Sequence, residues 1–199
     1  MLPAPTSFFV HLLESSRPDE YHSGFSEAMA LEQVLKFASV QHEKQYCASK
    51  SDFTRALQHI VHLNKWPAVL PVLHISAHGF EDGIALTSKE ILTWNELGHM
   101  LTSLHQITNG SYLLCMSSCR GLAAIKQAFA NGPPTFGIVG TLRDVNWSDN
   151  IIGFAAFYHL LQKGNSIHNA VAGMKAASGH DHYMFVHGPS LKKYLQWGT

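Results

Sequence analysis

The sequence has little charge and no excess of either sign, and both features exclude classes of partner. Charged residues make up 14% of the chain, and its 14 basic side chains equal its 14 acidic side chains in number. Nucleic acids and anionic membranes attract a basic excess, so neither is indicated here. We therefore expect no contact with nucleic acid or with a membrane.

Cysteine is also scarce, since it occurs only as Cys47, Cys115 and Cys119, without regular spacing. This pattern favours a reducing compartment over a disulfide framework. Residues 1–20 hold a short apolar stretch with no basic flank before it, which makes a poor signal peptide and is too short to cross a membrane. A chain of 199 residues suffices for one sizeable core, so we expect a cytoplasmic protein with one domain over residues 1–199.

What the sequence does have is apolar runs that alternate with helical patterns. Strands are predicted over residues 7–14, 45–50, 69–79, 111–119, 135–142 and 183–188, with a small strand or hairpin arm over 83–90. Helices are predicted over residues 27–40, 51–63, 94–106, 120–132, 150–164 and 166–178. For the helix over 51–63, Ser51 or Asp52 is the expected N-cap. This alternation predicts an α/β domain around a largely parallel sheet.

Two of the most apolar predicted strands end in reactive side chains. The run LHISAHG ends at His78 and Gly79, and the run LLCMSSC ends at Cys119. Loops at the carboxyl ends of parallel strands face one crevice, where ligands and catalytic groups gather. If the two strands are neighbours, an imidazole and a thiol face each other there. A thiolate with a histidine partner is suited to acyl transfer.

A glycine lies close to each of these residues, at Gly79 and Gly121. A glycine after the histidine would let a substrate backbone approach closely, and its N–H would point at a developing oxyanion. Gly121 suits a tight turn from strand to helix. A helix that begins near Arg120 would direct its N-terminal end at Cys119 and favour the thiolate. Arg120 itself is open to two interpretations, substrate contact or solvent exposure.

The sequence around these residues resembles the caspase-like cysteine peptidases of clan CD. Residues 119–121, Cys-Arg-Gly, match the end of the caspase signature, with Ser-Ser at 117–118 in place of the usual Gln-Ala pair. The remainder is more similar to the CHAT branch of that clan, with HISAHG, GIALT, IVGTL, FYHLLQKG and AVAGMKAA spread over residues 69–178. The resemblance implies a caspase-like three-layer sandwich, in which helices cover both faces of a mostly parallel central sheet.

The resemblance also implies an activity and the residues that carry it. It indicates a cysteine endopeptidase that cuts a protein substrate, with Cys119 as the nucleophile and His78 as the acid or base that serves the leaving amine. Backbone N–H groups of Gly79 and Cys119 would form the oxyanion hole. Relatives of this kind act in bacterial defence, including antiviral defence, or in cell death, where the protein that is cut is a gasdermin or another partner. No metal and no organic cofactor is implied.

Specificity is expected to reside in the segment after the strand IVGTL, where Arg143, Asp144 and Trp147 are candidate substrate-binding residues. Adjacent residues on a strand point to opposite faces, so only one of Arg143 and Asp144 would face the pocket. We favour Asp144, and with it a basic residue before the cut, because an ion pair in a desolvated pocket discriminates strongly. Asp144 and Asp149 are equally consistent with acids at the start of a helix.

Two other interpretations of the site stay open. His74 and His78, like Cys115 and Cys119, are four residues apart, which on a helix would suit zinc. On a strand four residues span about 13 Å, whereas zinc ligands lie about 2.0–2.3 Å from the metal, so one ion cannot hold all four. Cys115 is therefore expected to pack in the core. The second alternative is an inactive caspase-fold module that serves binding alone.

The segment after the predicted strand 111–119 bears on how the protein is activated. Executioner-type caspases have a long cleavable loop after the strand of the catalytic cysteine, whereas here the predicted helix 120–132 fills that interval. A helix leaves no exposed flexible tract for proteolytic nicking. We expect the intact chain to be active, with control by an activating partner or by access to the crevice.

Overall fold

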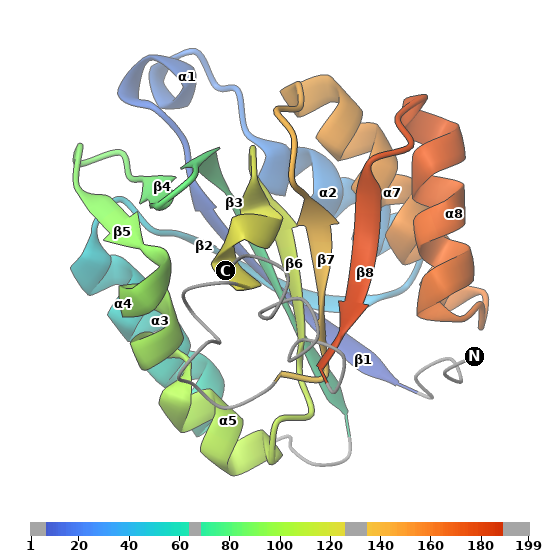
Figure 1. The fold of residues 1–199 in the computed structure, drawn as a ribbon, viewed down its shortest axis with the longest axis horizontal. Helices are drawn as coiled ribbons and strands as arrows, with labels where there is room; N and C mark the ends of the chain where they lie inside the picture. The colour runs from blue at the N-terminus through green and yellow to red at the C-terminus, as the bar shows by residue number, and fades with distance from the viewer. Residues whose placement is uncertain (1–6, 64–68, 126–134, 189–199) are drawn as a thin grey trace, which may run out of the picture.

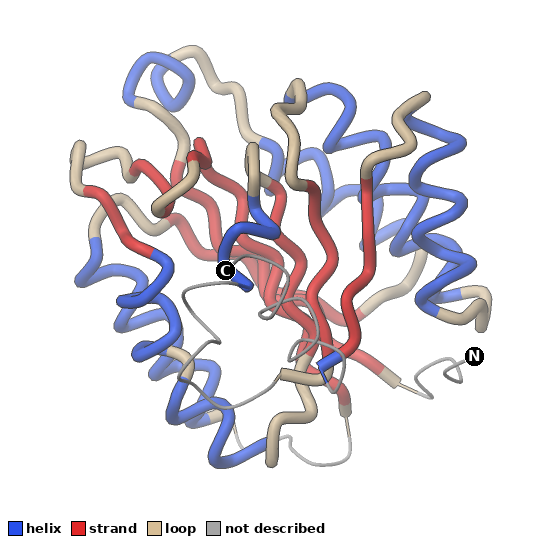
Figure 2. The backbone as a smooth tube through the Cα atoms, in the orientation of Figure 1, coloured by secondary structure: helices blue, strands red, loops and turns tan. Residues whose placement is uncertain are grey.

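The computed structural model describes residues 7–63, 69–125 and 135–188. Its main sheet has the strand order β2-β1-β3-β6-β7-β8, and Figure 2 shows these strands as one twisted sheet between helices. The strands are β1 (Phe8–Ser15), β2 (Gln41–Tyr46), β3 (Leu70–Phe80), β6 (Leu113–Ser117), β7 (Gly137–Thr141) and β8 (Tyr183–His187). The first five are parallel, and β8 is antiparallel to β7.

Helices cover both faces of this sheet, as Figure 1 shows. One face carries α2 (Glu27–Phe37), α7 (Trp147–Gln162) and α8 (Ile167–Ser178). The other carries α3 (Lys50–His62), α4 (Trp94–Met100) and α5 (Thr102–Thr108). The sequence-based prediction of an α/β domain with a mostly parallel sheet and helices on both faces is confirmed.

Four short elements stand at the edge of the sheet where the parallel strands end. The end of β3 pairs with β4 (Gly83–Ala85), which pairs in turn with β5 (Ile91–Thr93), so the expected hairpin arm at 83–90 is found as β4 and the turn after it. The helix α1 (Pro18–His22) comes after β1, and the 3-10 helix η1 (Gly121–Ala123) comes after β6. These elements surround the candidate site.

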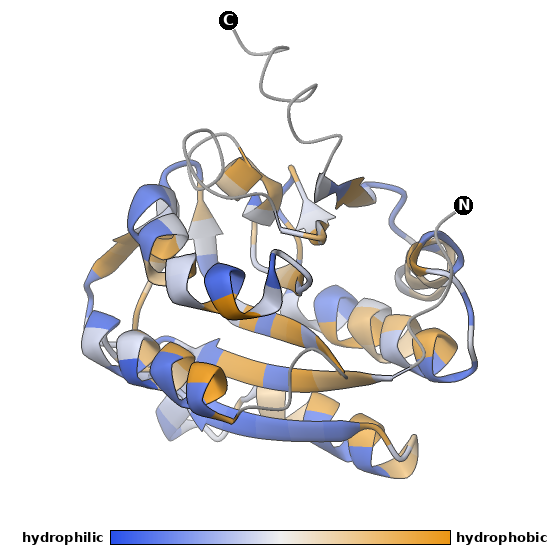
Figure 3. Cartoon of the chain, turned by 90° about the horizontal axis from the view of Figure 1, so that it is seen from below, coloured by the Kyte–Doolittle hydropathy of each residue, from blue (hydrophilic) through white to orange (hydrophobic). Residues whose placement is uncertain are grey.

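The strands are apolar because both of their faces are covered. Side chains alternate between two cores: Leu73 and Ile75 of β3 pack toward α3, α4 and α5, whereas Val72 packs toward α2, α7 and α8. Figure 3 shows the apolar strands enclosed between the two helical layers. The alternation has a functional consequence, because every second residue of a strand faces the same layer.

The predicted elements and the observed ones differ most where the sequence is polar. The strand expected over 45–50 lies instead at Gln41–Tyr46, because this edge strand of the sheet is largely exposed and has no apolar run to mark it. The helix after it begins at Lys50, with Ser49 as its N-cap instead of Ser51 or Asp52. The Ser49 hydroxyl accepts a hydrogen bond from the N–H of Asp52, whose carboxylate accepts the N–H of Ser49.

Three helix boundaries also differ from the predictions. The helix expected over 27–40 ends at Phe37, since Ser39 takes a left-handed conformation with φ 55°. The helix expected over 94–106 is two helices that meet at Leu101. Of the helix expected over 120–132, the first turn is the 3-10 helix η1, and residues 126–132 lie outside the described part of the chain. Within the described ranges, no helix has the length and apolar character needed to cross a bilayer.

Candidate functional site

The carboxyl ends of β3 and β6 are adjacent in the sheet. The register pairs His74 with Cys115 and Ser76 with Ser117. The pairing ends there: His78 lies two residues beyond Ser76, within β3, and Cys119 lies two residues beyond Ser117, in the turn that follows β6. The sheet therefore brings both strand ends to one edge, as the sequence predicted.

Gly79 shows how closely the two strand ends approach each other. A Cβ atom at this position would lie 2.1 Å from the carbonyl oxygen of Cys119 and 2.8 Å from Cβ of Ser118. No side chain fits there, so glycine is required for packing of β3 against the turn after β6. The prediction assigned the small residue to an approaching substrate; what it makes room for is the protein's own backbone.

The thiol of Cys119 is partly exposed and lies against the loop after β7. Its Sγ accepts a hydrogen bond from the N–H of Val145 at 3.4 Å and donates to the carbonyl oxygen of Val145 at 3.5 Å. The N–H is suited to a thiolate and the carbonyl oxygen to a thiol, so the backbone of Val145 can contact the sulfur in either form. Cys119 is thus held from one side by this loop.

The chain turns sharply after Cys119. Arg120 is left-handed, with φ 54°, and its N–H donates to the carbonyl oxygen of Arg143 at 3.1 Å. Gly121 then opens η1, where a Cβ atom would lie 2.6 Å from Cβ of Met116, so glycine suits this tight turn as expected. The chain does not enter an α-helix directly after Cys119, because a left-handed residue and a 3-10 turn come first. Most of the helix predicted over 120–132 lies outside the described residues, so the orientation of its N-terminal end stays a prediction.

His78 is 31% exposed and forms a hydrogen-bonded pair with a carboxylate that the sequence did not reveal. Its Nε2 lies 2.9 Å from Oε1 and 2.8 Å from Oε2 of Glu20. Glu20 belongs to α1, and its carboxylate also accepts the backbone N–H of Arg17 at 2.8 Å. The sequence signal was Pro18 at the first helical position with an acid two residues later, which indicates a helix start and nothing about histidine.

The Trp147 ring supplies a second contact to His78. The two rings meet edge to face with centroids 5.2 Å apart, and Trp147 also meets the ring of Phe25, at 5.9 Å. Phe25 borders a hollow of about 210 Å³ between α1 and the sheet edge, lined further by Tyr21, Met29 and Tyr46. Trp147 is not among the residues that line this hollow, so its role in substrate binding stays a prediction.

Arg143 and Asp144 lie in a loop, because β7 ends at Thr141. The argument that they point to opposite faces of a strand was therefore wrong. The Asp144 side chain is 74% exposed and accepts a hydrogen bond from Nε of Arg120 at 3.2 Å. Arg120 also lies 3.9 Å from Glu81, so it joins the loops on either side of Cys119. The Arg120 side chain is 46% exposed, which agrees with the interpretation that it faces solvent, and its ion pairs lie at the surface.

Asp149 takes the role of a helix-start acid, in the first turn of α7. Its carboxylate accepts a hydrogen bond from Nδ2 of Asn146 at 3.4 Å and lies 2.8 Å from Nε2 of His180. Asp144 precedes that helix, since α7 begins at Trp147.

Cys115 lies one buried layer below the site, and its environment differs from that of Cys119. Burial raises the pKa of its thiol to about 12. Its register partner His74 is also buried, and Nδ1 of His74 lies 2.9 Å from the hydroxyl of Tyr158. Between this layer and the site, the buried Glu27 accepts hydrogen bonds from Ser76 at 2.8 Å and from Ser117 at 2.6 Å. The prediction that Cys115 packs in the core is confirmed.

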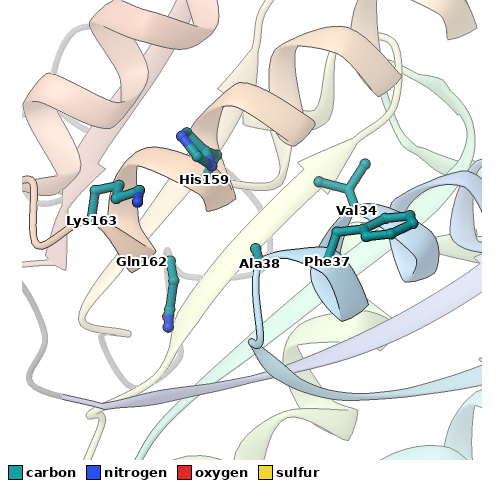
Figure 4. A pocket seen from close by; sticks show the side chains of 6 residues that line it. All are labelled: Val34, Phe37, Ala38, His159, Gln162 and Lys163. Carbon is teal, nitrogen blue, oxygen red and sulfur yellow. The ribbon is translucent and has the colours of Figure 1, made fainter.

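A larger hollow lies at the other ends of the helices that border the site. It has a volume of about 550 Å³ and lies between the C-terminal ends of α2 and α7, where Val34 and Phe37 face His159, Gln162 and Lys163 (Figure 4). None of the candidate catalytic residues lines it. Among the side chains that the structure describes, no three of the His, Cys, Asp and Glu type are grouped to hold a metal ion.

The sequence was compared with models of known families and with curated proteins. No family model matches the chain, and no curated protein matches it.

Proposed function

We propose that the chain is a cysteine endopeptidase of the caspase-like fold that cuts peptide bonds in a protein substrate. The observation that carries the proposal is the common edge of the neighbouring strands β3 and β6, where a partly exposed imidazole near the end of β3 and a partly exposed thiol in the turn after β6 come to the same edge of the sheet. The carboxyl edge of a parallel sheet is also the usual position of a catalytic crevice. Each of the two groups has a partner that suits the charged form, the N–H of Val145 for sulfur and the carboxylate of Glu20 for imidazole.

The proposed reaction proceeds in two halves. Sγ of Cys119 attacks the carbonyl carbon while the thiol proton passes to His78, and the N–H groups of Gly79 and Cys119 stabilise the oxyanion. The C–N bond then breaks, and His78 gives its proton to the leaving amine. A water molecule attacks the thioester, loses a proton to His78 and completes the new carboxyl group, and the released sulfur regains that proton.

For the substrate we propose a basic residue before the cut. Glu81 and Asp144 lie on the two loops that flank Cys119, and the single guanidinium of Arg120 lies between them. These two carboxylates can attract a basic side chain, in competition with Arg120 and with Arg143 of the same loop as Asp144. The resemblance to the caspase-like peptidases adds that the substrate is a partner protein, of the gasdermin type or another, in a defence or cell-death setting. We propose that control comes from an activating partner or from access to the crevice.

The test is an unbiased peptide library incubated with the purified chain, with cleavage sites identified by mass spectrometry. We expect cleavage by the wild-type protein, none by Cys119→Ala, and labelling by a peptidyl electrophile on Cys119 alone. Cys115→Ala is the matched control, because it removes a thiol from the same strand. Cleavage by Cys119→Ala at the wild-type rate would refute the proposal. A wild-type chain that neither cleaves nor reacts would instead support the inactive binding module.

A further inference from the structure

We propose that Glu20 is a positioning residue that completes a Cys119–His78–Glu20 arrangement. This inference rests on the proposed function, since it assigns a role within the same site. Glu20 does not touch the reacting atoms. It acts through His78, by fixing the orientation and the tautomer of the imidazole and by stabilising its protonated form.

The contact between Glu20 and His78 determines which ring nitrogen of His78 transfers protons in the reaction. Both carboxylate oxygens of Glu20 lie within 2.9 Å of Nε2, so this nitrogen carries the proton and donates it to the carboxylate. The neutral imidazole then has its lone pair on Nδ1. Nδ1 is the atom that accepts the proton of the thiol and later delivers it to the leaving amine.

Glu20 is itself held by its own helix. Its carboxylate accepts the backbone N–H of Arg17 at 2.8 Å and lies 3.1 Å from the Arg17 guanidinium, and the side chain is only 13% exposed. Burial raises the pKa of Glu20, but the hydrogen bonds from His78 and from the Arg17 backbone outweigh it, so the pKa is lower than usual. The carboxylate is therefore ionised at neutral pH.

Among the residues that the structure describes, the other neighbours of His78 do not duplicate its contact with Glu20. From α7 the ring meets Trp147, which is uncharged. The turn that carries Cys119 packs against Gly79, the next residue after His78, and behind Glu20 the Arg17 guanidinium opposes part of the carboxylate charge. Glu20 is thus the anion that stabilises an imidazolium at this position, and Cys119 supplies the other charge of the pair when it is a thiolate.

Glu20→Gln is the decisive variant, because the amide keeps the shape and an acceptor oxygen but removes the charge. Glu20→Asp keeps the charge on a shorter side chain. Asp19→Asn is the matched control, since Asp19 is the adjacent acid of the same helix, contacts Arg17 at 3.6 Å and is 74% exposed. No residue of α1 is buried, so all three variants are expected to fold.

The first measurement is steady-state cleavage of the best library peptide as a function of pH. For Glu20→Gln we expect kcat to fall about 10- to 100-fold, a part of the 10²–10⁴-fold that general acid–base help supplies, with KM nearly unchanged. The basic limb of the profile should move to lower pH, because the imidazolium has lost its anion. Glu20→Asp should recover part of kcat, and Asp19→Asn should match the wild type.

The second measurement needs no substrate: the rate at which iodoacetamide alkylates Cys119, monitored by mass spectrometry between pH 5 and pH 9. The thiolate–imidazolium pair reacts at low pH, so at pH 6 Glu20→Gln should react about tenfold more slowly than the wild type, since one adjacent opposite charge has been removed.

The two hypotheses fail in different ways. If Cys119→Ala still cleaves, the proposed function is wrong. If Cys119→Ala is inactive while Glu20→Gln keeps the wild-type kcat, pH profile and alkylation rate, only the role of Glu20 is refuted. A Glu20→Gln protein that loses kcat with an unchanged pH profile, and that loses no more than Asp19→Asn, has a structural defect and refutes the role as well.

Discussion

Two histidine–cysteine pairs lie on β3 and β6, and their surroundings are opposite. The inner pair, His74 and Cys115, faces directly across the two strands and is fully buried. The outer pair, His78 and Cys119, lies at the ends of the same strands and is partly exposed. Residue type therefore does not distinguish a structural thiol from a reactive one.

The two pairs differ in whether their side chains can carry a charge. Burial holds the inner thiol in its neutral form, with a pKa of about 12, and Tyr158 occupies Nδ1 of the inner histidine. A thiol that does not ionise is neither a nucleophile nor a metal ligand. The outer sulfur meets a backbone N–H. Both imidazoles lie near a carboxylate, the outer one 2.8 Å from Glu20 and the inner one 3.4 Å from Glu27, so the contrast lies in the sulfur and in the exposure of each pair. Charge separation is stabilised in the outer pair and suppressed in the inner pair.

The largest effect is expected when the outer histidine is removed, which tests whether the outer pair is the reactive one. His78→Ala should lower kcat by about 10²–10⁴-fold, because the leaving amine then lacks its proton donor. The melting temperature should change little, since the side chain is partly exposed. Steady-state kinetics measure kcat, and a thermal melt measures the melting temperature. Near-normal turnover in His78→Ala would exclude the dyad, and loss of activity in EDTA that zinc restores would revive the metal interpretation.

The next effect concerns the inner thiol, where we expect a loss of stability and no loss of activity. Cys115→Ala should reduce the free energy of unfolding by about 1–2 kcal/mol, because it removes a buried sulfur and leaves a small cavity. Its kcat should match the wild type. Urea unfolding monitored by circular dichroism gives the first value and peptide cleavage the second. Cys119→Ala is the control, with stability close to the wild type, and a catalytic defect in Cys115→Ala would show that the two pairs are not independent.

The smallest expected effect is a change in substrate preference. It concerns Asp144, in the loop after β7 that contacts the outer pair. Asp144→Ala should weaken the preference for a basic residue before the cut by about threefold to tenfold, a modest change because the carboxylate is exposed and screened. The library profile of cleavage sites measures it. Arg143→Ala, which removes the exposed side chain of the preceding residue, is the control. If Asp144→Ala leaves the profile unchanged and Arg143→Ala alters it, the specificity assignment passes to Arg143.

The sequence by itself determined the frame of the sheet and the two strand ends. Apolar runs mark buried strands, so β3 and β6 were predicted with His78 and Cys119 at their ends, and Cys115 was predicted inside. Both inferences use local information, because burial of a strand is encoded in the strand's own residues. The edge strand β2 was misplaced for the same reason, since its exposure leaves no apolar signal.

Only the tertiary structure decided which polar groups meet at the site. Glu20 lies 58 residues before His78, and Cys119 contacts Val145, 26 residues further along. Such contacts depend on strand order, on the left-handed turn at Arg120 and on the direction in which α1 leaves β1. No local pattern encodes them, because a carboxylate at a helix start looks the same whether it caps the helix alone or also holds an imidazole. Burial is a property of a segment, whereas the pairing of charges is a property of the whole fold.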